Sequence, residues 1–264
     1  MDDDTADGSW IGIFLRGVAM GTADTIPGVS GGTVALITGI YGRLVAAVAA
    51  VPSLAADVPD LVRREDSPSS RLRSADIPFL LVLLAGILAA VVTLSGVIHT
   101  LMGRYPAPMN ALFFGLIAAS AAVVRRDVTA ASARTAAAAS AGFLAAFLVT
   151  GVSGGAGIGN TLPAVFVSGA VASAAMLLPG ISGAAFLYIL GQYAYLTGTL
   201  SRFTGSVLSG SVSMSAGAVV LVFVAGVAAG VVSIARLVGH ALDRAPDATM
   251  AALVGLMVGA LRLP

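Results

Sequence analysis

Two long stretches without a charged residue constrain the fold more than any other feature of this chain. Residues 135–201 contain no Asp, Glu, Lys or Arg, and residues 203–235 are equally free of charge. About 20 apolar residues cross the hydrocarbon core of a bilayer, so each stretch can hold more than one crossing or a broken helix. Because 58% of the residues are hydrophobic and only 10% are charged, the sequence predicts a single all-α, polytopic membrane domain over residues 1–264.

Seven apolar segments follow one another along the chain. The first and the fifth are broken by a Pro-Gly pair, where proline removes a backbone donor and disfavours helix just before it. We call each of these broken segments an elbow, and we expect it either to cross the membrane fully or to enter it as a re-entrant hairpin. The seven segments cover residues 10–51, 77–102, 107–124, 136–150, 164–200, 216–237 and 249–263.

The sequence around the first elbow recurs around the second. PGVSGGTVALITGIY at residues 27–41 matches PGISGAAFLYILGQY at residues 179–193 with an offset of 152 residues. The aligned identities are Pro27/Pro179, Gly28/Gly180, Ser30/Ser182, Gly31/Gly183, Ile37/Ile189, Gly39/Gly191 and Tyr41/Tyr193. Chance accounts for about one or two identities in such a window, so the match indicates an internal duplication.

The match continues beyond the elbows, and it divides the chain into two copies. With an offset of 140 residues, the aligned pairs include Arg104/Arg244, Pro106/Pro246, Gly115/Gly255 and Leu116/Leu256. We therefore predict repeat 1 at residues 10–126 and repeat 2 at residues 164–264, each with one elbow and two spanning helices. A connecting transmembrane helix at residues 135–152 separates the repeats, and a polar cytoplasmic loop at residues 52–76 is an insertion in repeat 1.

The single connecting helix predicts that the two repeats have opposite orientations in the membrane. An elbow returns the chain to the side from which it entered, so one further helix inverts the second copy. We predict that the protein lies in the cytoplasmic membrane with its amino terminus on the cytoplasmic side. In this orientation eleven of the 14 Arg residues lie on the cytoplasmic side, as the positive-inside bias requires. Tyr41 and Tyr193 are then expected to be interfacial anchors. Inverted repeats with broken helices are typical of secondary transporters, whose substrate binds where the breaks meet.

Both elbows carry the residue pattern of an anion site. Each Pro-Gly pair precedes the start of a helix, where unpaired backbone N–H groups and the helix dipole favour negative charge, phosphate above all. The predicted substrate-binding residues are Pro27, Gly28, Ser30, Gly31, Gly32 and Thr33 in the first elbow and Pro179, Gly180, Ser182 and Gly183 in the second. The alternative is that the Pro-Gly pairs only kink a helix and that the small residues only permit tight helix packing.

Three charged residues flank the first elbow. Asp24 stands just before it in an apolar segment, where a carboxylate is costly unless it is paired or functional. We consider three roles for Asp24: a pair with Arg16 about two helical turns earlier, a cap on the following turn, or ion coupling or substrate contact. Repeat 2 has Met176 at this place, so any coupling through charge is asymmetric. Arg43 is a candidate for contact with a lipid headgroup, and snorkelling to the interface is the alternative.

The residue inventory excludes several kinds of site. The chain has no Cys, so it forms no disulfides. With two His and a single Glu, it cannot assemble a convincing metal centre or Ser/His/Asp arrangement. It has no lysine and hence no GxxxxGK[ST] nucleotide loop. A net charge of +1 without a basic patch gives no sign of nucleic-acid binding. We therefore expect no cofactor, no metal and no enzymatic activity.

The two elbow motifs also resemble those of a known family. RGVAMGTADTIPGVSGGTVALITGIYGRL at residues 16–44 and MLLPGISGAAFLYILGQY at residues 176–193 are similar to the polyprenyl-phosphate transporters of bacteria and archaea. The resemblance covers nearly the whole chain. It implies that the substrate is a polyprenyl phosphate, undecaprenyl phosphate in bacteria, which is returned across the cytoplasmic membrane for reuse in envelope synthesis. Ala184 and Ala185 stand where the first motif has Gly32 and Thr33, which predicts a weaker phosphate grip in the second elbow.

Our leading hypothesis is a transporter that moves a polyprenyl phosphate between leaflets by alternating access. The headgroup is held between the elbows, the tail stays among membrane lipids, and Asp24 is the candidate for proton exchange. A carrier of a small anion is the alternative within the same class. A membrane enzyme acting on a lipid phosphate and a non-catalytic scaffold are alternatives from other classes.

Overall fold

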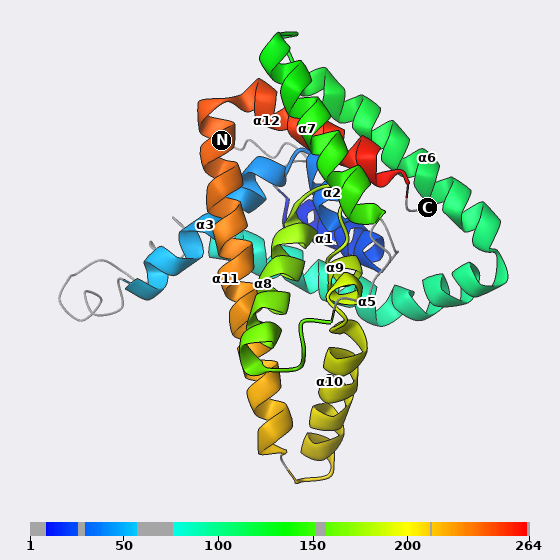
Figure 1. Ribbon diagram of the computed structural model, residues 1–264, viewed down its shortest axis with the longest axis vertical. Coiled ribbons are helices and arrows are strands. Elements are labelled where there is room, and N and C mark those ends of the chain that lie inside the picture. Colours follow the sequence, from blue (N-terminus) through cyan, green and yellow to red (C-terminus); the bar gives the residue numbers. More distant parts are fainter. Residues whose placement is uncertain (1–8, 26–29, 57–75, 152–156, 212, 263–264) are drawn as a thin grey trace.

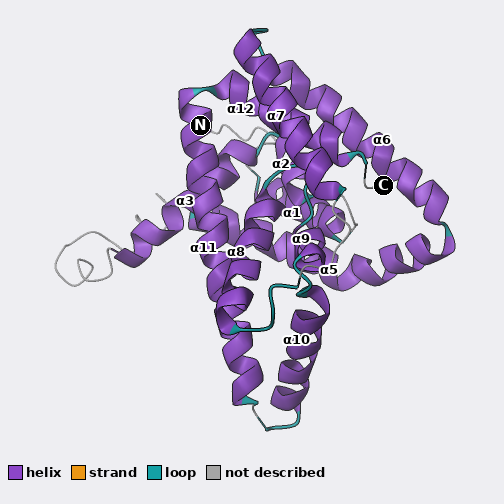
Figure 2. Cartoon of the chain, in the orientation of Figure 1, coloured by secondary structure: helices purple, strands orange, loops and turns teal. Residues whose placement is uncertain are grey.

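The computed structural model describes residues 9–25, 30–56, 76–151, 157–211 and 213–262. Helices and their connecting turns account for all of this part of the chain, and no strand occurs in it (Figure 2). The predicted all-α class is therefore confirmed. Four helices in the described ranges are long and apolar enough to cross a membrane, namely those within residues 77–94, 106–127, 133–150 and 214–244.

Among the described residues, repeat 1 contains five α-helices and repeat 2 contains five more (Figure 1). The helices of repeat 1 are α1 (Trp10–Asp24), α2 (Gly31–Ile37), α3 (Tyr41–Ala56), α5 (Ile77–Arg104) and α6 (Pro106–Val124). After a short 3-10 turn, η2 (Arg125–Asp127), the connecting helix is α7 (Ala133–Thr150). The helices of repeat 2 are α8 (Leu162–Leu177), α9 (Gly183–Ile189), α10 (Tyr193–Leu208), α11 (Met214–Arg244) and α12 (Pro246–Ala260).

The elbow helices recur with the spacing of the sequence repeat. Adding 152 to the bounds of α2 and α3 gives the bounds of α9 and α10, and adding 140 to the last residue of α5 gives the last residue of α11. Each elbow therefore contains a separate seven-residue helix between two longer arms, where the sequence predicted only two arms. Pro52, the predicted start of the polar loop, instead lies inside α3, which continues to Ala56.

Glycine explains the sharp end of each short helix. Gly39 and Gly191 are counterparts, and both have the left-handed conformation, with φ of 75° and 67°. In both elbows the next residue donates a hydrogen bond back into the helix, from Ile40 N–H to the Ala35 carbonyl and from Gln192 N–H to the Leu187 carbonyl. This is the geometry of a Schellman cap, which glycine adopts without steric cost. The repeated glycine thus separates the short helix from the following arm.

Each repeat is held together by the same close helix crossing. In repeat 1, α1 packs on α5, and a Cβ atom added to Gly86 would collide with the carbonyl of Phe14. In repeat 2, α8 packs on α11, and a Cβ added to Gly226 would collide with the carbonyl of Phe166. Phe14 and Gly86 are the counterparts of Phe166 and Gly226. Small residues let the backbones approach in this way in membrane helix pairs, so the two repeats share one framework.

The connecting helix α7 packs along α12 of repeat 2. It does not pack in this way along α6, which is the counterpart of α12 in repeat 1. A Cβ added to Gly142 of α7 would collide with the carbonyl of Ala252, and one added to Gly255 of α12 would collide with the carbonyl of Ala139. Gly115 of α6, the counterpart of Gly255, has no atom within 4 Å of its Cβ position. The packing therefore places the connecting helix with repeat 2.

Candidate functional site

The first elbow begins its short helix with two side-chain caps. Ser30 is the N-cap of α2, and its Oγ accepts a hydrogen bond of 3.1 Å from the Gly32 N–H. Asp24, at the end of α1, accepts one of 2.7 Å at Oδ1 from the Gly31 N–H. A Cβ at Gly31 would lie only 2.8 Å from Asp24 Oδ2, so glycine is what lets the carboxylate approach. The chain thus supplies its own anion at this helix start.

The first elbow is also tied to repeat 2 by two hydrogen bonds. Ser30 Oγ donates to the Met176 carbonyl over 2.9 Å, and the Gly180 N–H donates to Thr33 Oγ1 over 3.0 Å. Both hydroxyl side chains are 1% exposed. Gly32 lies against the Leu177 carbonyl, 2.7 Å from where its Cβ would be. In this conformation these hydrogen bonds connect the two repeats, and neither Ser30 nor Thr33 lines the two cavities found at the second elbow.

The second elbow starts its short helix at the corresponding residue but leaves its polar groups free. Ser182 is the N-cap of α9, yet its side chain makes no capping hydrogen bond. Met176 takes the place of Asp24, and its Cβ lies 3.4 Å from the Cβ position of Gly183. Since a thioether is only a weak acceptor, none of the described residues gives the Gly183 N–H an acceptor like Asp24. The start of α9 is therefore open.

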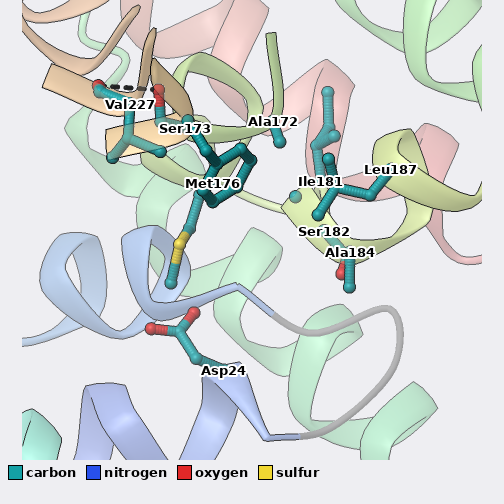
Figure 3. A pocket seen from close by; sticks show the side chains of 11 residues that line it. Asp24, Ala172, Ser173, Met176, Ile181, Ser182, Ala184, Leu187 and Val227 are labelled. Carbon is teal, nitrogen blue, oxygen red and sulfur yellow. Dashed lines mark hydrogen bonds between the residues drawn. The ribbon is translucent and has the colours of Figure 1, made fainter. Parts of the chain in front are cut away.

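A cavity of about 290 Å³ lies between the end of α1, the elbow of repeat 2 and α11. Its lining residues are Asp24, Ala172, Ser173, Met176, Ile181, Ser182, Gly183, Ala184, Leu187, Phe223 and Val227. Figure 3 shows Asp24 on one side, with its carboxylate directed into the cavity, and Ser182 and Ala184 on the other. The lining is largely apolar with a few polar groups, which is the usual character of a ligand pocket.

A second cavity of about 180 Å³ adjoins the first on the far side of the second elbow. Ile181 and Ser182 line both cavities and therefore lie between them. The remaining lining residues come from the end of α7 and from α9: Val149, Thr150, Ala185, Phe186, Tyr188 and Ile189. Ser182 is thus the polar residue that faces both spaces.

The other predicted site residues lie elsewhere. Arg43 forms a salt bridge with Asp76, in which Nε lies 2.5 Å from Oδ2, and its guanidinium lies 4.2 Å from the centre of the Phe79 ring. Neither Arg16 nor Arg43 lines the cavity beside Asp24. Tyr41 is only 3% exposed, so its predicted role as an interfacial anchor is wrong. Pro27 and Gly28 lie outside the described residues, whereas Pro179 and Gly180 are buried within the second elbow.

Eight of the eleven residues that line the cavity beside Asp24 are missing from the sequence-based prediction: Ala172, Ser173, Met176, Ile181, Ala184, Leu187, Phe223 and Val227. The Met176 backbone carbonyl accepts the hydrogen bond from Ser30 Oγ, and the Met176 side chain points toward Asp24 (Figure 3). Ser173 donates a hydrogen bond of 3.0 Å to the Val227 carbonyl, and Phe223 completes the wall from α11. The repeat alignment offered one signal, because Met176 is the counterpart of Asp24. Ser173 and Phe223 are indistinguishable by sequence from other residues of apolar helices.

The fold and the cavity together define a multi-pass α-helical membrane protein with two copies of a broken-helix unit around a small, mostly apolar site. Comparison with known sequences identifies its family. Residues 20–264 match the VCA0040-like, undecaprenyl phosphate translocase-like family, and the chain belongs to it. It is 34% identical over 254 residues to a polyprenyl-phosphate transporter of Vibrio cholerae, covering 96% of this chain and 77% of that protein. No solved structure matches the chain.

Proposed function

We propose that this protein transports a polyprenyl phosphate across the cytoplasmic membrane, so that the lipid carrier is recycled for envelope or glycan synthesis. The observation that carries the proposal is the cavity at the second elbow, in a chain of the undecaprenyl phosphate translocase-like family. An open helix start and the Ser182 hydroxyl offer donors to a phosphate, and the apolar walls suit the first carbons of a prenyl tail.

The phosphate headgroup binds at the second elbow in the conformation described here. There, Ser182 and the first N–H groups of α9 have no side-chain cap, so the headgroup meets donors that are not already bonded. At the first elbow, Asp24 and Ser30 already accept the N–H groups of Gly31 and Gly32. The site of phosphate contact therefore changes during transport, rather than lying on both elbows at once.

Asp24 takes up a proton when the phosphate enters the cavity. A carboxylate and a phosphate monoester repel each other at short range in a medium of low dielectric constant, and protonation of Asp24 removes this repulsion. Flux in liposomes should then respond to an imposed pH gradient, and Asp24→Asn should remove that response. A wild-type rate that is indifferent to the gradient contradicts the role for the proton.

The amino terminus lies in the cytoplasm, and the two repeats have opposite orientations in the membrane. The distribution of Arg residues supports this topology. An affinity tag at the amino terminus should be protected from added protease in intact cells. Digestion of the tag in intact cells contradicts the assignment.

The decisive experiment measures movement of a polyprenyl monophosphate between the leaflets of liposomes that contain the purified protein. We expect the monophosphate to move and the matched prenol and prenyl diphosphate to move much less. Adding inorganic phosphate as a competitor distinguishes the polyprenyl-phosphate transporter from a carrier of a small anion, because only the small-anion carrier needs to accept free phosphate. Empty liposomes and heat-inactivated protein are the controls, and equal rates for monophosphate in all three samples refute the proposal.

A further inference from the structure

The two elbows are docked differently on the opposite repeat, although their sequences and helices correspond. In repeat 1, α3 packs along α11 of repeat 2. The corresponding pair, α10 and α5, is not packed in this way; α10 lies beside α11 instead (Figure 1). The α3 arm of the first elbow is thus docked against the other repeat, and the α10 arm of the second is not.

The exposure of counterpart residues follows the same division. Tyr41 is 3% exposed and its counterpart Tyr193 is 46% exposed, whereas Leu36 is 8% exposed and its counterpart Tyr188 is 68% exposed. The within-repeat framework shows no such division, because Gly86 and Gly226 make the same backbone contacts. The difference between the two elbows therefore lies in how each meets the opposite half.

We infer that the protein has a second conformation in which the two elbows exchange their docking. In it, α9 and α10 dock on repeat 1, and α2 and α3 leave repeat 2. The hydrogen bond from Ser30 to the Met176 carbonyl is then replaced by one from Ser182 to the Asp24 carbonyl, since these are the counterpart residues. This closes the cavity at the second elbow and opens one at the first. The inference rests on the proposed transport by alternating access.

The cavity lining supports this exchange and explains the place of Asp24. Among the eleven lining residues, Asp24 and Met176 are a counterpart pair, related by the offset of 152 residues. When the two repeats exchange roles, Asp24 takes the place of Met176 and Met176 takes the place of Asp24. Both side chains therefore line the cavity in either conformation. Ser182, by contrast, is replaced in the lining by Ser30. Asp24 is therefore the ionisable group that faces the substrate from both sides of the membrane.

Disulfide trapping tests the exchange directly, because the natural chain has no Cys. A Cβ at Gly239 of α11 lies 3.4 Å from Val45 Cγ1 of α3, so Val45→Cys with Gly239→Cys is within reach of a disulfide in the present conformation. The counterparts of these positions are Thr197 of α10 and His99 of α5. Thr197→Cys with His99→Cys should therefore crosslink only in the exchanged conformation.

Mild oxidation of protein in lipid membranes should crosslink both pairs. The matched control is Thr197→Cys with Gly239→Cys, which neither conformation brings together. The inference is overturned if the 45/239 pair crosslinks but the 99/197 pair crosslinks no more than the control. Failure of the 45/239 pair overturns it as well, because the docked first elbow is then wrong. Reduced samples, which should elute as one species and remain helical by circular dichroism, show that each variant folds.

A second readout separates this inference from the proposed function. A single cysteine in place of Ser30 and one in place of Ser182 should react with a membrane-impermeant thiol reagent from opposite sides of the membrane. When either cysteine is added to a protein whose disulfide holds the other elbow open, it should be protected from the reagent. If both pairs crosslink and no polyprenyl phosphate moves, the exchange stands and the proposed substrate is wrong. If polyprenyl phosphate moves and the 99/197 pair never crosslinks, the function stands and the exchange is wrong.

Discussion

The two elbows have the same backbone plan and different surroundings. At the first, Asp24 and Ser30 cap the short helix, and Ser30 and Thr33 are buried against repeat 2. At the second, the corresponding helix has no side-chain cap, and Ser182 faces two cavities. The change from Asp24 to Met176 removes an acceptor, and the change from Thr33 to Ala185 removes a hydroxyl. A duplicated motif can therefore provide a structural joint in one copy and an open site in the other.

The largest expected effect tests whether the framework is the same in both repeats. Gly86→Ala and Gly226→Ala should each lower the free energy of unfolding by about 3 kcal/mol, because the added methyl group would collide with the carbonyl of Phe14 or Phe166. Unfolding by sodium dodecyl sulfate in bicelles measures the loss. Gly115→Ala is the matched control, since nothing lies within 4 Å of its Cβ position. A large difference between the two variants would show that the frameworks are not equivalent.

The next effect tests the joint between the elbows. Thr33→Val removes the acceptor of the Gly180 N–H and leaves that donor buried without a partner, at a cost of about 2 kcal/mol in the free energy of unfolding. Ala185→Val changes the counterpart position, where no such bond exists, and should change stability much less. The same bicelle assay measures both. Equal losses would mean that the Thr33 hydrogen bond does not distinguish the elbows.

A smaller effect tests the cap supplied by Asp24. Asp24→Ala should lower the free energy of unfolding by about 1 kcal/mol, because the Gly31 N–H loses its acceptor. Asp24→Asn retains an acceptor oxygen and should recover most of this loss, while Met176→Ala should cost little, since Met176 caps no N–H group. If Asp24→Asn is as unstable as Asp24→Ala, the charge rather than the hydrogen bond stabilises the elbow.

The smallest effect tests which serine meets the substrate. Ser182→Ala should weaken binding of a polyprenyl monophosphate about fivefold, the value of one hydrogen bond, without changing stability. Ser30→Ala should instead reduce stability and leave binding in the present conformation nearly unchanged, because its hydroxyl already donates to the Met176 carbonyl. Titration with a short-chain prenyl phosphate, with the free prenol as control, measures both. Equal weakening by the two variants would place the headgroup between the elbows.

Local patterns in the sequence determined much of this fold. Charge-free stretches indicate membrane helices, because a bilayer cannot solvate charges or free backbone groups. The repeated Pro-Gly and Ser residues located the helix starts after Ser30 and Ser182, whereas the ends of these short helices before Gly39 and Gly191 were not predicted. Caps and turns depend on residues a few positions apart, so sequence alone can reveal them.

Only the tertiary structure decided how the two elbows differ. The contact between Ser30 and Met176 joins residues 146 positions apart, and the bond between Gly180 and Thr33 spans 147 positions. Nothing in the local sequence around the identical Ser30 and Ser182 indicates that one is buried and the other lines a cavity. The pairing of Arg43 with Asp76 likewise depends on how α3 meets the start of α5. Burial and pairing over such separations result from the packing of whole helices, which is a property of the assembled chain.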